Sequence, residues 1–247
     1  VGGCPTAVPG ENVCAGATDN ATGVAAAMSV VRSIAAGGPP RRSIIVAFWD
    51  AEEDGLLGSK AYVESPLIPL DKTIAYVNFD IQGLVLLPSL ASTTVVVGAG
   101  TGGPSLMEAT VRAAGASTLA SAHLSLVFGQ GRSDHAVFAG AGVPSVFYTD
   151  ANSGCYHTAQ DDVAAVDFGK LDQQIAAAET LTRDLVATDT PPVFDASAPL
   201  SRFEDAVAMR DIVARGIADL ALLPDETAAA LTGFQADLDA IVAAGAD

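Results

Sequence analysis

Residues 42–60 of the chain read RSIIVAFWDAEEDGLLGSK. The first part of this stretch, residues 42–49, is a continuous apolar run rich in β-branched side chains. Such a run is typical of a central strand that is buried on both faces of a parallel sheet. Four carboxylates follow within five residues, at Asp50, Glu52, Glu53 and Asp54. Because adjacent like charges repel, this cluster predicts a site at the end of the strand where a positive charge offsets them.

Strand-like and helix-like segments alternate on either side of this run. The alternation predicts an α/β fold with a mixed, mostly parallel central sheet that is flanked by helices. The predicted strands lie at residues 42–49, 73–79, 92–99, 123–128 and 144–149, and the predicted helices at residues 19–36, 56–65, 104–115, 133–142 and 167–188.

Composition divides the chain into three parts. Residues 1–188 carry the α/β pattern and are predicted to form the catalytic or binding domain. Residues 189–199 contain two adjacent prolines and are interpreted as a linker. Residues 200–247 are predicted to form a helical extension of two helices, interrupted near Leu223 and Pro224.

The overall charge excludes some classes of partner. The chain of 247 residues carries 29 acidic and 12 basic side chains, for a formal net charge of −17. A surface of this sign repels phosphate backbones, which argues against nucleic-acid binding. No apolar stretch reaches the roughly 20 residues that a membrane-spanning helix needs.

Two of the cysteines flank a short loop near the start of the chain. Cys4 and Cys14 enclose a proline- and glycine-containing segment, CPTAVPGENVC. We expect a disulfide between them, which would place the protein in an oxidising compartment, secreted or periplasmic. Two reduced loop cysteines are the alternative.

Further polar residues follow the predicted strands. Asp80 ends one strand, the strand at residues 144–149 leads to His157, and Asp19 stands in the first turn of the first helix. Ligands of open α/β sheets bind at the carboxyl ends of strands, and clustered carboxylates there call for cations. Carboxylates alone suit Mg²⁺ or Ca²⁺, whereas a histidine favours a transition metal such as Zn²⁺. Singly, Asp19 also fits a helix cap, the glutamate pair a solvated face, Asp80 a turn and His157 a loop.

Taken together and in order, these segments resemble a known family. The motifs GATDNATGVAAAMSVVRSIA, RRSIIVAFWDAEEDGLLGS, VNFDIQG, GRSDHAVF and CYHTAQDD are similar to those of the co-catalytic zinc aminopeptidases of the bacterial leucyl-aminopeptidase type. The resemblance covers about residues 1–188 in the correct order. It implies the zinc exopeptidase fold and two bound Zn²⁺ ions.

The resemblance also implies a role for each matching residue. Asp19 matches the carboxylate that bridges both metals, and Glu53 and His157 match the ligands of one of them. Asp80 matches a ligand of the other metal. Glu52 matches the general base, and Tyr156 matches a tyrosine that steadies the tetrahedral intermediate. The remaining matches, which lie near the substrate in the family, are Arg132, Ser133 and Asp134; a helix cap is the alternative for Asp134.

The implied activity is removal of N-terminal residues from peptides. A water held between the two metals would lose its proton to Glu52, which would pass it to the leaving amine. The substrates would be peptides with a free N-terminus, whose amine would lie against carboxylates. The alternatives on the same scaffold are a carboxypeptidase and a glutaminyl-cyclase-like enzyme.

One part of the family pattern is missing. The family has a His-x-Asp motif upstream of the bridging aspartate, and none of the 18 residues before Asp19 is a histidine. We therefore expect an N-terminally truncated chain that binds the second zinc poorly. A non-catalytic binding domain is the alternative that this absence favours.

Overall fold

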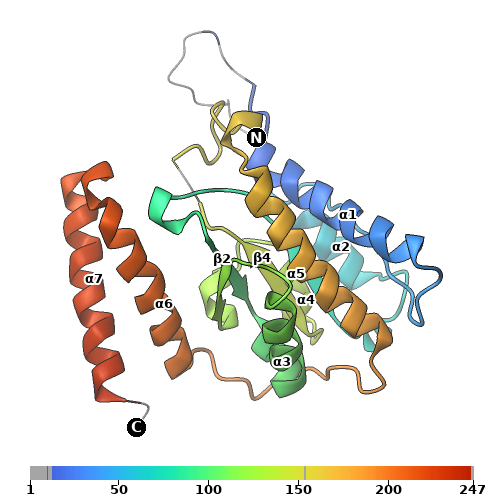
Figure 1. Ribbon diagram of the computed structural model, residues 1–247. Coiled ribbons are helices and arrows are strands. Elements are labelled where there is room, and N and C mark those ends of the chain that lie inside the picture. The colour runs from blue at the N-terminus through green and yellow to red at the C-terminus, as the bar shows by residue number, and fades with distance from the viewer. Residues whose placement is uncertain (1–9, 11–12, 153, 246–247) are drawn as a thin grey trace.

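A four-stranded mixed sheet forms the centre of the protein. The computed structural model describes residues 10, 13–152 and 154–245. The strands are β1 (Tyr76–Phe79), β2 (Thr93–Val97), β3 (Ala120–Leu124) and β4 (Ser145–Thr149), in the spatial order β1-β4-β2-β3. β1 pairs with β4 and β2 with β3 in parallel, whereas β2 and β4 are antiparallel. The predicted mixed, mostly parallel α/β fold is confirmed (Figure 1).

Helices cover both faces of the sheet because its strands alternate apolar side chains between two layers. Val96, Val146 and Tyr148 pack against α1 (Thr22–Ala36), α3 (Gly103–Ala114) and α5 (Phe168–Ala187). Val97 and Phe147 face the other way, toward α6 (Phe203–Gly216). The other α-helices are α2 (Leu57–Glu64), α4 (His135–Gly140) and α7 (Asp225–Ala244). The shorter helices are η1 (Ala17–Ala21), η2 (Leu70–Lys72), η3 (Pro88–Leu90), η4 (Ala99–Gly102), η5 (Leu126–Gly129), η6 (Val163–Ala165) and η7 (Ile217–Leu222).

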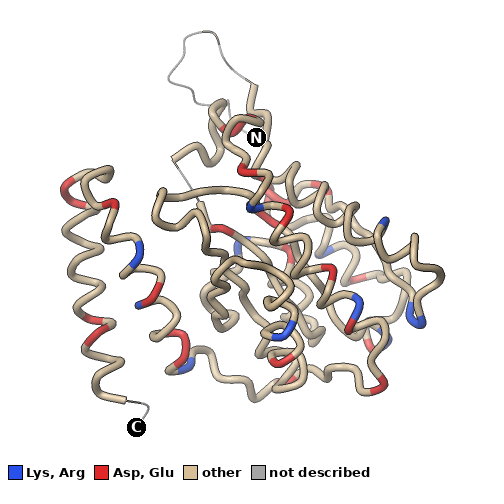
Figure 2. Tube along the Cα trace, viewed as in Figure 1, with Lys and Arg blue, Asp and Glu red and all other residues tan. Residues whose placement is uncertain are grey.

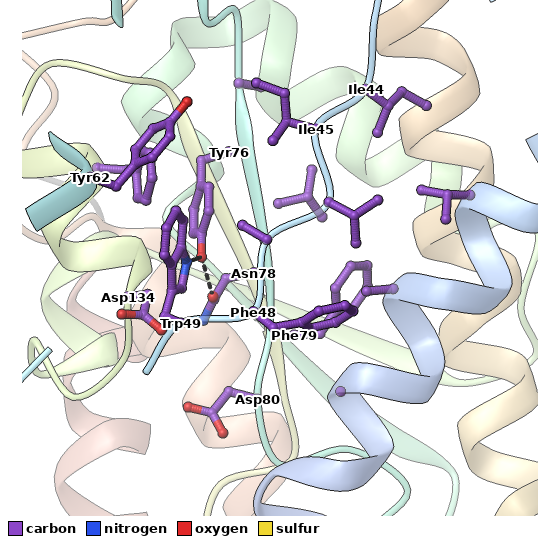
Figure 3. A pocket seen from close by; sticks show the side chains of 18 of the residues that line it. Ile44, Ile45, Phe48, Trp49, Tyr62, Tyr76, Asn78, Phe79, Asp80 and Asp134 are labelled. Atoms are coloured by element: carbon purple, nitrogen blue, oxygen red, sulfur yellow. Dashed lines mark hydrogen bonds between the residues drawn. The ribbon is translucent and has the colours of Figure 1, made fainter. Parts of the chain in front are cut away.

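The prediction of a buried central strand at residues 42–49 is wrong for this structure. The described residues contain no strand there, although the segment lines the same cavity as β1 (Figure 3). Ile45, Val46 and Phe48 are 50, 40 and 56% exposed. The physical reason is that no neighbouring strand reaches the segment, since a cavity separates it from β1. The strand predicted at residues 123–128 is only partly correct. The observed strand β3 ends at Leu124, and the second half of the predicted segment forms η5.

The two predicted C-terminal helices are present as α6 and α7, and the break between them lies close to Pro224. Asp205 anchors α6 to the end of β3, because its buried carboxylate accepts hydrogen bonds from the backbone N–H groups of Ser125 and Arg202. The two helices lie side by side at the opposite end of the molecule from α1 (Figure 1). The boundaries of the three predicted parts stay a prediction.

The surface is predominantly acidic. Asp and Glu outnumber Lys and Arg along the trace (Figure 2). None of the helices in the described part of the chain is long and apolar enough to cross a membrane.

Candidate metal centre

Three predicted ligands meet at one point. Asp19 lies in η1, Glu53 in the turn after residues 43–49, and His157 in the loop after β4. The Nε2 atom of His157 is 2.8 Å from Oε1 of Glu53 and 3.2 Å from Oδ2 of Asp19. One ligand atom from each of the three lies within 4.8 Å of the others, a separation that suits a single metal ion. The structure therefore brings together residues that are far apart in the chain, since Glu53 and His157 are 104 positions apart.

Asp161 holds Asp19 in place, and the sequence reasoning missed it. Its carboxylate is almost fully buried and accepts hydrogen bonds from the backbone N–H groups of Thr18 and Asp19 and from the Thr18 hydroxyl. These bonds fix the backbone that carries the ligand. The signal that could have found Asp161 is its place in CYHTAQDD, the segment that also carries His157.

The residue after Asp19 ties this turn to β1. The side-chain amide of Asn20 donates to the carbonyl oxygen of Phe79 at 2.9 Å, next to Asp80. Gly23 makes this approach possible, because a Cβ atom there would stand 2.1 Å from Asn20 Oδ1 and 2.5 Å from the Phe79 carbonyl oxygen. Asp19 and Asp80 are thereby held on neighbouring elements.

The two adjacent glutamates begin a tight turn. Backbone N–H groups of Gly55 and Leu56 donate to the Glu52 carbonyl oxygen, and Gly55 has a φ of 101° that favours glycine. Glu53 faces His157, whereas Glu52 is half-buried and has Asp80 as its strongest charged neighbour. Burial first, and then the charges of Asp80 and Glu53, raise the pKa of Glu52 to about 8.

Asp80 lies at the end of β1 and is almost buried. Burial raises its pKa to about 7, with the charges of Asp19 and Asp134 adding to this and a hydrogen bond from Ser133 opposing it. Its Oδ1 atom has no hydrogen-bond partner among the described residues. An orphaned, buried carboxylate oxygen of this kind is a position that a cation would satisfy.

The motif GRSDH contributes unequally to the site. Ser133 is buried and receives a hydrogen bond from Asn78 at 2.7 Å, which supports its bond to Asp80. Asp134 is buried and lines the cavity with Asp80, and its side chain does not cap α4 (Figure 3). Arg132 is exposed and does not line this cavity, so its predicted substrate contact stays a prediction.

Tyr156 lies directly on His157. The two rings stack with their centres 3.7 Å apart and their planes at 21°. Partial burial and the charges of Glu53 and Asp19 raise the pKa of Tyr156 to about 12, so that its hydroxyl stays protonated at neutral pH. Tyr156 therefore supplies a proton donor beside the three ligands.

Asp150 lies away from this cluster. Asp150 follows β4 but forms a buried ion pair with Lys170 at 2.9 Å and accepts a bond from Gln174, so it binds α5 and is not part of the ligand cluster. Cys4 lies outside the described residues, and the predicted disulfide with Cys14 stays a prediction.

The residues present fit one zinc ion well. Asp19, Glu53 and His157 offer two carboxylates and an imidazole, all of them ligand types that zinc takes, and three protein ligands leave a fourth position open as in catalytic zinc sites. For a second ion, Asp19 and Asp80 offer carboxylates from the described residues. Neither His123 on β3 nor the buried His135 belongs to the cluster.

We expect the metal-free protein to lose stability as the pH rises from about 4 to about 8. Asp19, Glu52 and Asp80 have pKa values of about 6, 8 and 7, raised from 3.8, 4.5 and 3.8. Acids whose pKa is raised by folding hold protons that the unfolded chain has released, so their contribution to stability is lost as pH passes the folded value. Thermal melts in a chelator should show this fall. Added zinc should reduce this fall of the melting temperature with pH. A melting temperature that does not depend on zinc across this pH range would contradict the assignment of these carboxylates to a metal centre.

Replacing Asp161 with asparagine should weaken zinc binding by about 10–100-fold without removing a ligand. The change removes the negative charge of the side chain that accepts hydrogen bonds from the N–H groups of Thr18 and Asp19. Isothermal titration with zinc measures the effect. The neighbouring Asp162 is the matched control, because its side chain caps η6 instead; an equal loss in Asp162→Asn would contradict a specific role for Asp161.

The chain is similar to proteins of a known family. The pattern of Peptidase family M28 matches residues 5–181, more than two thirds of the chain. Leupeptin-inactivating enzyme 1 of Streptomyces exfoliatus is 29% identical over 209 residues, which cover 72% of this chain and 44% of that protein. A probable glutamate carboxypeptidase of Zea mays, VP8, is 42% identical over 76 residues, 28% of this chain and 11% of that protein.

Solved structures agree on the fold. The LapA aminopeptidase of Legionella pneumophila superposes with a TM-score of 0.62 at 21% identity, over 73% of this chain and 49% of that one. BSAP, a zinc aminopeptidase from Bacillus subtilis, gives 0.58 at 23% identity, over 74% of this chain and 46% of that one. The chain thus spans less than half the length of these relatives. The match over residues 5–181 shows that the chain belongs to peptidase family M28.

Proposed function

We propose that this chain carries the active site of a zinc-dependent aminopeptidase that hydrolyses N-terminal residues of peptides. The observation that carries the proposal is the convergence of Asp19, Glu53 and His157, with Glu52 held next to them but outside the ligand cluster. That arrangement separates the tasks of binding a metal and moving a proton. The names of the aminopeptidase relatives support the substrate class.

Zinc held by Asp19, Glu53 and His157 would supply Lewis acidity, which lowers the pKa of a water molecule to about 7. Glu52 would then accept the proton of the attacking water and pass it to the nitrogen of the leaving amine. Its half-buried place beside Asp80 gives the carboxylate a high proton affinity, and the positive charge of zinc held nearby would lower its pKa again, so that Glu52 is ionised and able to accept a proton. The phenol of Tyr156 would donate a hydrogen bond to the oxygen that gains negative charge.

Selection of an N-terminus would come from the remaining carboxylates. Asp80 and Asp134 line the cavity next to Glu52 and Glu53, and all of them favour a cationic group. The free α-amine of a peptide is such a group, whereas a C-terminal carboxylate would be repelled. A separate proposal, secretion or a periplasmic location, rests on the expected Cys4–Cys14 disulfide.

The experiment that tests the proposal compares two substrates. The purified protein, loaded with zinc, should hydrolyse leucine-4-nitroanilide and leave a peptide with a C-terminal glutamate intact. The second candidate, a carboxypeptidase, is favoured by the similarity to the Zea mays protein. Release of glutamate without cleavage of the nitroanilide would replace the first proposal by the second.

A further inference from the structure

A buried ion pair holds the bend of the chain that follows Asp80. Lys170, in the first turn of α5 (Figure 1), and Asp150, directly after β4, have their charged atoms 2.9 Å apart, and their side chains are 4 and 1% exposed. Both side chains also bind the backbone of Leu84. The Lys170 ammonium donates to its carbonyl oxygen at 2.6 Å, and the Asp150 carboxylate accepts from its N–H group at 3.0 Å. The pair thus encloses a peptide segment that lies four residues after a predicted metal ligand.

Gln174, one turn further along α5, completes this enclosure. Its side-chain oxygen accepts from the N–H group of Gly83 at 2.9 Å. Its side-chain nitrogen donates to Asp150 at 2.9 Å and to the Thr94 hydroxyl at 2.8 Å. The N–H group of Asp167, the N-cap residue of α5, donates to the Gly83 carbonyl oxygen at 2.7 Å. All four backbone polar groups of the two-residue segment therefore bond to α5, to its N-cap or to Asp150.

The bend itself has a backbone conformation that its sequence does not favour. Ile81, the residue after Asp80, has a φ of 54°, and Ala151, the residue after Asp150, has a φ of 63°. Positive φ is uncommon for residues other than glycine and is an outlier for a β-branched residue such as Ile81. Such conformations persist where the surrounding structure fixes them. Here the enclosed segment fixes the chain on one side of Ile81, and the Asp150 N–H group donates to the Ile81 carbonyl oxygen at 2.8 Å.

The ion pair suits a role in positioning better than a role in stability alone. Removing two charges from water costs free energy that their attraction only partly returns, and apolar residues of similar volume often stabilise a fold as well or better. Apolar residues cannot, however, donate to and accept from the backbone at fixed points. Lys170 and Asp150 do both at Leu84, one from α5 and the other from the end of β4. The bend is therefore fixed relative to both of these elements.

We propose that Lys170 and Asp150 are positioning residues of the metal centre, which act through the backbone of residues 81–84 to fix the place of the Asp80 carboxylate. Among the described residues, neither belongs to the ligand cluster. The inference rests on the proposed function, because it takes Asp80 as a ligand of the second zinc ion. The first zinc site has a support of its own in Asp161, whose carboxylate holds the backbone of Asp19.

Zinc titration of the variant Lys170→Met tests the proposal, with the first zinc site as an internal reference. Methionine keeps a long unbranched side chain but removes the donor to the Leu84 carbonyl oxygen. The affinity for the second, weakly bound zinc should fall about 10–100-fold, the loss expected when a residue that supports a ligand is removed. The affinity for the first zinc should stay nearly unchanged.

Two further variants separate positioning from a general loss of stability. Lys170→Arg should keep both zinc affinities, because a guanidinium can make the same two contacts and a cavity of about 70 Å³ beside Lys170 and Asp150 has room for it. Asp205→Asn is the matched control. Asp205 is also a buried carboxylate that accepts from a backbone N–H group, that of Ser125, but it lies beyond β3, at the opposite edge of the sheet from β1. This control should lower the melting temperature and change neither zinc affinity.

Amide hydrogen exchange in a chelator gives a readout that depends neither on zinc nor on activity. In Lys170→Met the amides of Asp80, Gly83 and Leu84 should exchange about 10-fold faster or more, while the Ser125 amide stays unchanged. Asp205→Asn should show the reverse pattern. Absence of aminopeptidase activity in the unaltered chain would overturn the proposed function without altering this result, so the two failures are distinguishable.

Gln174→Met provides the same test in a protein whose ion pair is intact, should Lys170→Met not fold. It removes the acceptor of the Gly83 N–H group, so the Gly83 and Asp80 amides should again exchange faster. Unchanged exchange at Asp80 in the variants that fold would overturn the proposal. So would an equal loss of both zinc affinities in Lys170→Met, an equal loss of the second affinity in Asp205→Asn, or an unaltered chain that binds no second zinc.

Discussion

Replacing Glu52 with glutamine is expected to lower turnover by about 10²–10⁴-fold while leaving zinc binding nearly unchanged. The amide keeps the size of the side chain but cannot accept the proton of the attacking water. Glu52 lies beside Asp80 and outside the cluster of Asp19, Glu53 and His157, so its loss removes no ligand from that cluster. Hydrolysis of leucine-4-nitroanilide, with zinc content measured on the same samples, gives both quantities.

The adjacent Glu53→Gln is the matched control, because it makes the same chemical change one residue away. Its Oε1 atom contacts Nε2 of His157 at 2.8 Å, so this variant should lose zinc occupancy first and activity as a result. Excess zinc should restore part of the activity of Glu53→Gln and none of that of Glu52→Gln. If the two variants lost zinc equally, the division of roles between the glutamates would be wrong.

Much of the site could be predicted because its residues belong to short motifs. Glu53 follows an apolar run, Asp80 ends β1, and His157 follows β4, so the rule that ligands gather at the carboxyl ends of strands brings them together. The predicted helices appear near their expected places for the same local reason: each carries its own apolar period and its own stop signal, such as the glycines after α1.

The part that could not be predicted depends on neighbours rather than on local sequence. Residues 43–49 have the composition of a central strand, but a strand exists only where another backbone lies alongside it, and a cavity lies there instead. The role of Asp150 also depends on a residue that is distant in the sequence. Asp150 follows a strand as Asp80 does, but it forms an ion pair with Lys170 on α5 instead of joining the metal centre. Asp161 was missed because its partners, the N–H groups of Thr18 and Asp19, are 143 and 142 positions away in the chain.

The chain of 247 residues is expected to hold one zinc ion tightly and a second one weakly. The first site has three side-chain ligands from the described residues. For the second, the described residues offer the carboxylates of Asp19 and Asp80, and His123 and His135 lie outside the cluster. Zinc content after dialysis against a weak chelator measures this directly. Binding to the folded state alone should also raise stability by about 2.7 kcal/mol at a free zinc concentration 100 times Kd.

His157→Ala should abolish the tight site, because it removes the imidazole that contacts both Asp19 and Glu53. The loss of zinc affinity should exceed the 10–100-fold that removal of a supporting residue costs. His123→Ala is the matched control, since His123 lies on β3 and outside the cluster, and it should keep the zinc-dependent rise in melting temperature. Two tightly held zinc ions in the unaltered chain, or one retained by His157→Ala, would mean that the metal is bound by a different set of residues.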